Sequence, residues 1–201
     1  MVSTIYMSTR PLTAAIRTVS GLLILIILSS GAPDSLNIPR PVLRQLQARY
    51  RENNFKINIL KETSGCKTGT IGQLTRSDGK MLGYVYWGKV NTCRGGGCST
   101  PDIPREADHS DFFRYFILFD TVGRVEKIKV YEYASLHGHG ITSERWLKQF
   151  IGYSGQTQLR PGKEIDGLSG ATTSVNAFVK DLENTSKCLE NFLQNAFIIP
   201  R

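Results

Sequence analysis

The spacing of apolar residues changes along the chain from residue 41 onward, and this spacing predicts which segments are helices and which are strands. Pro41 opens a helix, because proline is favoured at a first helical position and the apolar residues after it follow helical spacing. The apolar stripe of this helix consists of Val42, Leu43, Leu46 and Tyr50. Phe55, Ile57 and Ile59 alternate with polar residues, and residues 82–90 are rich in aromatic and β-branched side chains, so both segments are expected to be strands.

Two strongly apolar segments lie on either side of a turn in the middle of the chain. Residues 112–119 are the most hydrophobic stretch of this part, residues 121–124 turn the chain, and residues 125–133 are again rich in β-branched and aromatic side chains. We expect the two segments to pair as an antiparallel hairpin.

Helices are predicted again toward the C-terminus. Thr142 or Ser143 is in position to cap a short helix over residues 144–150. A longer amphipathic helix is predicted over residues 173–197, with an apolar stripe of Val175, Phe178, Val179, Leu182, Leu189 and Leu193. The whole pattern predicts an α+β fold: a mainly antiparallel sheet with flanking helices and a C-terminal amphipathic helix.

The first 32 residues differ from the rest of the chain. Arg10 and Arg17 precede the apolar run 21–28, small residues follow it, and the segment holds no Asp or Glu. This order is typical of a secretory signal peptide. The run is shorter than the roughly 20 residues of a transmembrane helix, and an uncleaved N-terminal anchor is the alternative. We therefore expect an exported protein, periplasmic or anchored to the outer face of the cytoplasmic membrane, with residues 1–32 as signal or anchor, 33–40 as linker and 41–201 as a single domain.

The positive charge of the chain does not point to nucleic acid. The formal net charge is +8, and the part after residue 32 still carries 23 basic and 17 acidic side chains. These basic residues are scattered, without a run of five or more and without a known DNA- or RNA-binding motif. We interpret them as a solvated basic surface and expect no nucleic-acid partner.

Four cysteines, Cys66, Cys93, Cys98 and Cys188, suit disulfides in an exported protein. Cys93 and Cys98 enclose a glycine-rich loop that could close on itself, which would leave Cys66 to pair with Cys188; the sequence does not determine this connectivity. Two other interpretations stay open. Cys93 and Cys98 together with His137 and His139 offer a tetrahedral Zn²⁺ set, and Cys93 with Cys98 offers a redox pair, although without the usual Cys-x-x-Cys spacing.

Small and hydroxyl-bearing residues gather just before the last predicted helix, over residues 166–174, which read Asp-Gly-Leu-Ser-Gly-Ala-Thr-Thr-Ser. Gly170 lets another group approach its backbone closely. Thr172, Thr173 and Ser174 lie at the helix N-terminus, where free backbone N–H groups and the positive end of the dipole favour phosphate. The plain alternative is a turn at Gly167 followed by an ordinary N-cap cluster.

Asp166, Ser169, Gly170, Ala171 and Thr172 reproduce a motif, Asp-x-x-Ser/Thr-Gly-Ala-Thr, and the segment resembles the FMN-binding domain family. That domain occurs in the sodium-translocating NADH:quinone oxidoreductase, in the Rnf complex and in small periplasmic proteins. The resemblance implies that Thr172 receives FMN as a phosphodiester from a flavin transferase, and that Asp166 belongs to the pattern which the transferase recognises. Ser169, Gly170 and Ala171 would shape the turn, and Thr173 and Ser174 would help to hold the phosphate.

A second segment agrees with the same family. Residues 130–141 resemble the family's strand that runs into a glycine-containing loop, and residues 146–150 resemble the short helix ending in Gln-Phe that follows. The resemblance extends over about residues 123–182, and it implies that the loop with Gly138, His139 and Gly140 lies near the flavin. We interpret Trp146 and Phe150 as core residues.

These features together predict a flavoprotein that carries electrons, rather than an enzyme that transforms a substrate. FMN is the expected cofactor, with no catalytic side chain and no metal. The expected partners are a flavin transferase and electron-transfer proteins of the membrane or periplasm. The alternative is a Zn²⁺-binding or non-catalytic binding module that uses Cys93, Cys98, His137 and His139.

Overall fold

The computed structural model describes residues 38–50, 55–60, 68–92, 111–135 and 138–198. The chain divides into two units, Met1–Ile38 and Pro39–Arg201, and every element described below belongs to the second. The expected signal segment lies outside the described residues. None of the helices in the described ranges is long and apolar enough to cross a membrane.

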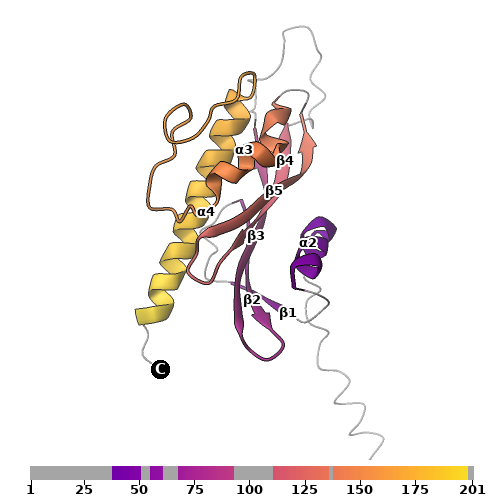
Figure 1. The fold of residues 1–201 in the computed structure, drawn as a ribbon, viewed down its shortest axis with the longest axis vertical. Helices are drawn as coiled ribbons and strands as arrows, with labels where there is room; N and C mark the ends of the chain where they lie inside the picture. Colours follow the sequence, from indigo (N-terminus) through magenta and orange to yellow (C-terminus); the bar gives the residue numbers. More distant parts are fainter. Residues whose placement is uncertain (1–37, 51–54, 61–67, 93–110, 136–137, 199–201) are drawn as a thin grey trace, which may run out of the picture. The chain divides into compact units, whose positions relative to one another are not determined.

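The centre of the second unit is an antiparallel sheet whose strands follow one another in chain order (Figure 1). Its strands are β1 (Phe55–Ile59), β2 (Gly69–Arg76), β3 (Met81–Asn91), β4 (Phe112–Phe119) and β5 (Val125–Ala134). β4 and β5 form the predicted hairpin, with Phe116 opposite Lys129. At its turn, one carboxylate oxygen of Asp120 accepts hydrogen bonds from the backbone N–H groups of Val122 and Arg124.

β2 is a strand that the apolar pattern does not predict, because glycines occupy positions where a side chain would be expected. A Cβ on Gly69 would lie 2.5 Å from the ring of Tyr86, and a Cβ on Gly72 would lie 2.6 Å from a methyl group of Ile57. Neighbouring strands fill this space with their own large side chains. The lack of alternation in β2 therefore reflects close packing by its neighbours.

One face of the sheet is covered by the long helix α4 (Thr172–Ile198), as Figure 1 shows. Its predicted stripe is confirmed: Val175, Phe178, Val179, Leu182 and Leu189 are all buried in the main core, and Leu193 is partly buried against it. The ring of Phe178 lies 5.1–6.0 Å from four other aromatic rings, those of Phe113, Tyr115, Trp146 and Phe150. This aromatic cluster joins α4 to the sheet and to the segment 144–150.

The other face of the sheet carries α2 (Arg40–Tyr50), on the opposite side from α4 (Figure 1). Val42 and Leu46 of α2 are fully buried. The guanidinium of Arg49 donates a hydrogen bond of 2.6 Å to the carboxylate of Glu126 on β5. The sheet also buries a second set of side chains that do not belong to the main core, namely Leu74, Val85, Phe116 and Leu118. Helices on both faces and antiparallel strands confirm the predicted α+β class.

The helix predicted over residues 144–150 is interrupted. It consists of α3 (Glu144–Leu147) and the 3₁₀ turn η3 (Lys148–Phe150), preceded by a second 3₁₀ turn, η2 (His139–Thr142). Ser143 is the N-cap residue, one of the two predicted, but its side chain makes no capping hydrogen bond. The Thr142 hydroxyl donates instead to the carbonyl of His139, 2.8 Å away, within the preceding turn.

Candidate functional site

The first turn of α4 places two hydroxyl groups in solvent and buries a third. Gly170 has a φ of +74°, a left-handed conformation that glycine adopts without strain. Ala171 follows with its side chain buried in the core, and its carbonyl accepts the first-turn hydrogen bond of α4 from the N–H of Val175. Thr172 and Thr173 then point outward and are exposed.

Ser174 faces the protein and is held by β5. It is 5% exposed, and its hydroxyl lies 3.0 Å from the hydroxyl of Tyr133. Thr172 and Thr173 are therefore the accessible side-chain hydroxyls at the start of α4, next to backbone N–H groups that a helix leaves without internal partners. Such a terminus suits an anionic group such as a phosphate.

The glycine loop 138–140 contacts this helix terminus. Gly138 has a φ of +82°, and a Cβ at this position would lie 2.6 Å from the Tyr133 hydroxyl oxygen and 2.9 Å from the Ser174 hydroxyl oxygen. Only glycine fits there without displacing one of these side chains. The neighbouring imidazole of His139 is exposed and lies 4.8 Å, between ring centroids, from the Tyr133 ring.

Gly140 brings the same loop against the motif segment. A Cβ on Gly140 would lie 3.0 Å from a methyl carbon of Leu168, so the two segments pack closely. The structure thus brings together the two separate parts of the sequence that were selected as candidate site residues. His137 lies outside the described residues.

Beside this contact lies an open cavity of about 660 Å³. Its lining combines α3, the loop 138–140 and the segment before α4, with residues Gly140, Ser143, Arg145, Trp146, Gly162, Lys163, Ile165, Asp166, Gly167 and Leu168. The volume is within the range of small-molecule and cofactor sites. Two cations, Arg145 and Lys163, and one carboxylate, Asp166, line it, so an anionic ligand meets a net positive wall.

Asp166 is held at this cavity by its backbone. Its carbonyl accepts a hydrogen bond of 2.9 Å from the indole N–H of Trp146, and its own N–H donates to the side-chain oxygen of Gln149 at 2.6 Å. The Asp166 side chain remains exposed. Trp146 was predicted to be a core residue; it is buried as expected, and it also forms part of the cavity wall.

The turn that presents Lys163 is fixed by an ion pair. The Glu164 carboxylate accepts hydrogen bonds from the backbone N–H and the guanidinium of Arg160. The hydrogen bonds from the Arg160 side chain lower the pKa of Glu164 to about 2. Gly162 closes the turn by donating to the carbonyl of Ile165 at 2.8 Å. Glu164 is thus paired, whereas Asp166 presents its carboxylate to solvent.

A buried carboxylate farther along α4 was not anticipated from the sequence. Asp181 of α4 is 4% exposed and accepts hydrogen bonds from the hydroxyls of Tyr86 at 2.8 Å and Tyr115 at 2.7 Å, and from that of Thr68. Burial raises the pKa of both tyrosines. The signal in the sequence was an acidic residue beside the apolar stripe of α4, three residues after Phe178.

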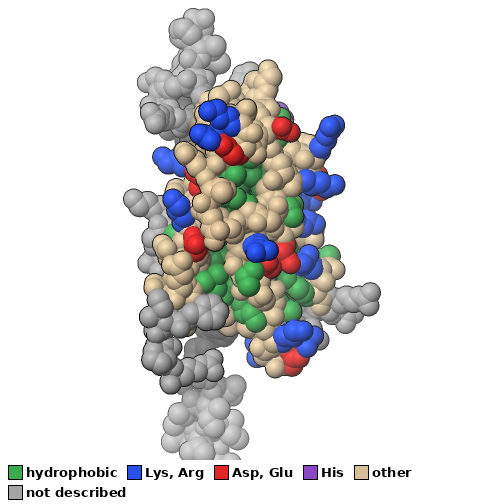
Figure 2. Space-filling model, turned by 60° about the vertical axis from the view of Figure 1, so that its left-hand side comes forward, with side chains coloured by type: hydrophobic (Ala, Val, Ile, Leu, Met, Phe, Trp, Pro, Cys, Tyr) green, Lys and Arg blue, Asp and Glu red, His purple; other side chains and the backbone are tan. Residues whose placement is uncertain are grey.

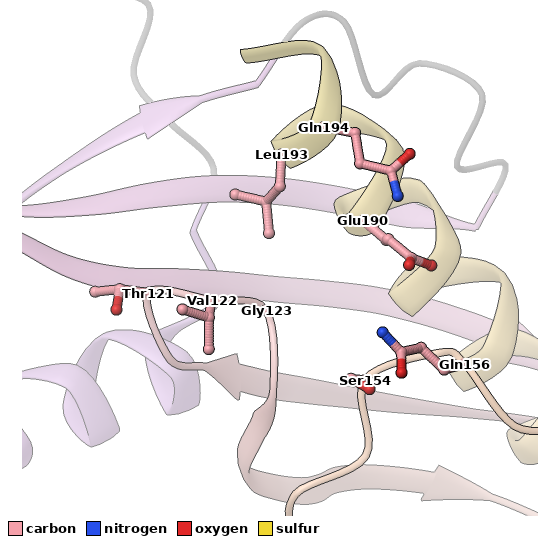
Figure 3. Close-up of a pocket in the computed structure, with 8 residues that line it drawn as sticks. All are labelled: Thr121, Val122, Gly123, Ser154, Gln156, Glu190, Leu193 and Gln194. Carbon is pink, nitrogen blue, oxygen red and sulfur yellow. The ribbon is translucent and has the colours of Figure 1, made fainter. Parts of the chain in front are cut away.

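A smaller cavity of about 260 Å³ lies at the other end of the domain, between the β4–β5 turn, the loop after η3 and the C-terminal half of α4. Figure 3 shows Glu190 and Leu193 of α4 on one side and Val122 of the turn on the other. It holds none of the predicted site residues. On the face shown in Figure 2, Lys and Arg side chains lie in small separate groups, several of them beside Asp or Glu, as expected of a solvated surface.

The predicted alternatives that use cysteine fall largely outside the described residues. Cys66, Cys93, Cys98 and His137 lie there, while Cys188 on α4 is disulfide-bonded. Among the residues that the structure does describe, no group of three or more His, Cys, Asp or Glu side chains is arranged to hold a metal ion. The connectivity suggested above, Cys93 with Cys98 and Cys66 with Cys188, stays a prediction.

Comparison with known protein families gives a match over the part of the chain that contains the candidate site. A family model described as the FMN-binding domain matches residues 109–187. The match includes β4, β5, the loop 138–140, the cavity lining and the first four turns of α4. No curated protein shows significant sequence similarity to the chain.

Proposed function

From the match of residues 109–187 to the FMN-binding domain family, with FMN as the cofactor that this domain indicates, we propose that the protein is an exported flavoprotein which carries FMN covalently on Thr172. The phosphodiester would join the Thr172 hydroxyl to the phosphate of FMN. The protein would then act as an electron carrier in the cell envelope. The observation that carries this proposal is the exposed Thr172 hydroxyl at the first residue of α4, four residues after Leu168 of the cavity lining.

The choice of Thr172 among the nearby hydroxyls rests on burial and on the motif. Ser174 is buried and bonded to Tyr133, so it is a poor acceptor for a bulky nucleotide. Ser169 and Thr173 are exposed like Thr172. The resemblance selects Thr172, because in the family the last Thr of the Ser-Gly-Ala-Thr sequence carries the flavin. Ala171 supports this choice, since its burial turns the next side chain outward.

The residues around the cavity fit a flavin nucleotide. A volume of about 660 Å³ accommodates a cofactor of this size. Backbone N–H groups at the start of α4 would bind the phosphate, and Arg145 and Lys163 would offset its negative charge. Gly140 and Leu168 also line the cavity.

In this arrangement the bound FMN supplies the redox chemistry, and the protein supplies position and electrostatics. The buried side chains of Trp146 and Ile165 would give the cofactor an apolar contact on one side of the cavity. The aromatic cluster around Phe178 holds α3 and the start of α4 in fixed relation. A covalent link to Thr172 would prevent loss of the cofactor from an exported protein. The partners we propose are a flavin transferase and electron-transfer proteins of the envelope.

Covalent attachment can be tested by in-gel flavin fluorescence after denaturation. We expect a fluorescent band for the wild-type protein purified from its native envelope, and for Thr172→Ser, which keeps a hydroxyl. The band should be absent for Thr172→Val. Thr173→Val is the matched control, because it removes the neighbouring exposed hydroxyl, and it should keep the band. A colourless wild-type protein would favour the alternative of a binding module without flavin.

A further inference from the structure

We propose that Trp146 and Gln149 are positioning residues for FMN attachment: they hold the Asp166 peptide from both sides, and thereby fix the segment 166–172 in the form that the flavin transferase recognises. This inference rests on the proposed function above, since it assumes that Thr172 is the residue modified.

Both backbone polar groups of Asp166 are bonded to side chains of the short helical segment 144–150. The indole N–H of Trp146 donates to the Asp166 carbonyl at 2.9 Å, and the Asp166 N–H donates to the Gln149 side-chain oxygen at 2.6 Å. No bond to the Asp166 carboxylate is involved, and that side chain is exposed. The two contacts therefore determine where the carboxylate is displayed without covering it.

The two side chains that hold Asp166 are themselves fixed. Trp146 is 6% exposed, and its ring packs at 5.0 Å from Phe150 and 5.3 Å from Phe178. The amide of Gln149 has its oxygen on the Asp166 N–H, while its nitrogen is buried and has no hydrogen-bond partner among the described residues. A buried amide nitrogen without a partner costs free energy. Packing alone would favour an apolar side chain at residue 149. We therefore attribute the glutamine at this position to its hydrogen bond with the Asp166 N–H.

The segment that follows is attached at two further points. Leu168 packs against Gly140, and Ala171 is buried in the core directly before Thr172. The residues between these attachments, including Gly167, Ser169 and Gly170, are exposed. The result is a surface strip with an acidic side chain at one end and the acceptor hydroxyl at the other, at a fixed separation. Because this strip is already ordered, less conformational entropy is lost when the transferase binds it.

Gln149→Leu and Gln149→Glu separate positioning from packing. Leucine fills the space but removes the acceptor, whereas glutamate keeps an oxygen for the Asp166 N–H. In the assay, purified flavin transferase breaks the pyrophosphate bond of FAD, joins the FMN phosphate to the Thr172 oxygen, and releases AMP with the hydroxyl proton. We expect Gln149→Leu to raise the KM for the acceptor protein by about 5- to 10-fold, the effect of one hydrogen bond. Gln149→Glu should restore the wild-type KM. Without flavin, hydrogen exchange of the Asp166 amide should be faster in Gln149→Leu than in wild type.

Leu189→Ala and Trp146→Phe complete the experiment. Leu189 is fully buried in the same core but lies beside Gly123, in the C-terminal half of α4, so Leu189→Ala should lower Tm and leave the KM unchanged. Trp146→Phe removes the N–H donor and should raise the KM. If wild type is labelled and Gln149→Leu has the wild-type KM, or if Leu189→Ala raises the KM equally, the positioning role is wrong while the proposed function stands. A wild-type protein that takes up no flavin would overturn both.

Discussion

The hydroxyl oxygens of Tyr133 and Ser174 lie 3.0 Å apart, which joins the end of β5 to the first turn of α4. This contact sits under loop 138–140, because the space for a side chain at Gly138 is taken by these same two oxygens. The geometry of the candidate site thus depends on a strand, a glycine loop and a helix terminus meeting at one point.

Gly138→Ala tests this junction. The new methyl group would collide with Tyr133 and Ser174, and the residue would keep a φ of +82° that alanine rarely adopts. Gly152→Ala is the matched control, since Gly152 has a φ of +87° and nothing lies within 4 Å of its Cβ position. We expect Gly152→Ala to cost about 1 kcal/mol from backbone strain alone, and Gly138→Ala to cost clearly more. Thermal unfolding measures both, and equal losses of Tm would contradict the crowded junction.

Asp181→Ala tests the buried carboxylate. The substitution leaves the hydroxyls of Tyr86 and Tyr115 inside the core without their acceptor, so we expect a loss of roughly 3 kcal/mol or more in the free energy of unfolding. For a chain of this size, that corresponds to a drop in Tm of about 6–12 °C. Asn184→Ala, at an exposed position on the same helix, should change Tm little. Urea unfolding gives the free energies directly, and a small loss for Asp181→Ala would show that the carboxylate does not stabilise the core.

The stability of the fold should fall in alkaline solution. Burial raises the pKa of Tyr86 and Tyr115 above the usual value of 10, and that of Tyr153 to about 12. In the unfolded chain these hydroxyls lose their protons near pH 10, whereas in the folded protein they keep them, so stability is full below pH 10 and is lost as pH rises above it. We expect Tm to decline above pH 10, less steeply in Tyr86→Phe. Equal slopes for the two proteins would be evidence against burial of this hydroxyl.

Asp166→Asn should reduce flavin loading without affecting the fold. The Asp166 side chain is exposed, and the contacts that fix this residue use only its backbone. We therefore expect a wild-type Tm and slower incorporation of flavin by the transferase. Glu144→Gln is the control, because it removes an exposed carboxylate of α3 outside the motif. Loading of Asp166→Asn at the wild-type rate would remove this carboxylate from the recognition pattern.

Much of the fold follows from local spacing of apolar residues. The stripe of α4 is predicted because its buried residues recur at the helical period. The β4–β5 hairpin is predicted because two apolar segments flank a turn. β2 could not be predicted in this way, since Gly69 and Gly72 make room for Tyr86 and Ile57 of neighbouring strands. Such a strand is specified by its partners, which the local sequence does not reveal.

The residues of the candidate site could be proposed from the sequence, but their contacts could not. Small residues and hydroxyls before α4 indicate an anion site, and the resemblance to the FMN-binding domain selects Thr172 and the glycine loop at Gly138. The bonds from Trp146 and Gln149 to Asp166 join residues 20 and 17 positions apart through loop conformation. The Asp181 network likewise joins residues from separate strands and α4, so neither could be read from local spacing.

Intact mass of the protein from its native envelope tests the central claim most directly. The account predicts that the wild-type polypeptide is heavier than its sequence, after any signal cleavage, by one FMN minus one water, and that fragmentation places this addition on Thr172. Thr172→Val should have the mass of the bare polypeptide, while Thr173→Val should carry the addition. A wild-type mass equal to the bare polypeptide, or an addition that persists in Thr172→Val, would contradict covalent attachment at Thr172.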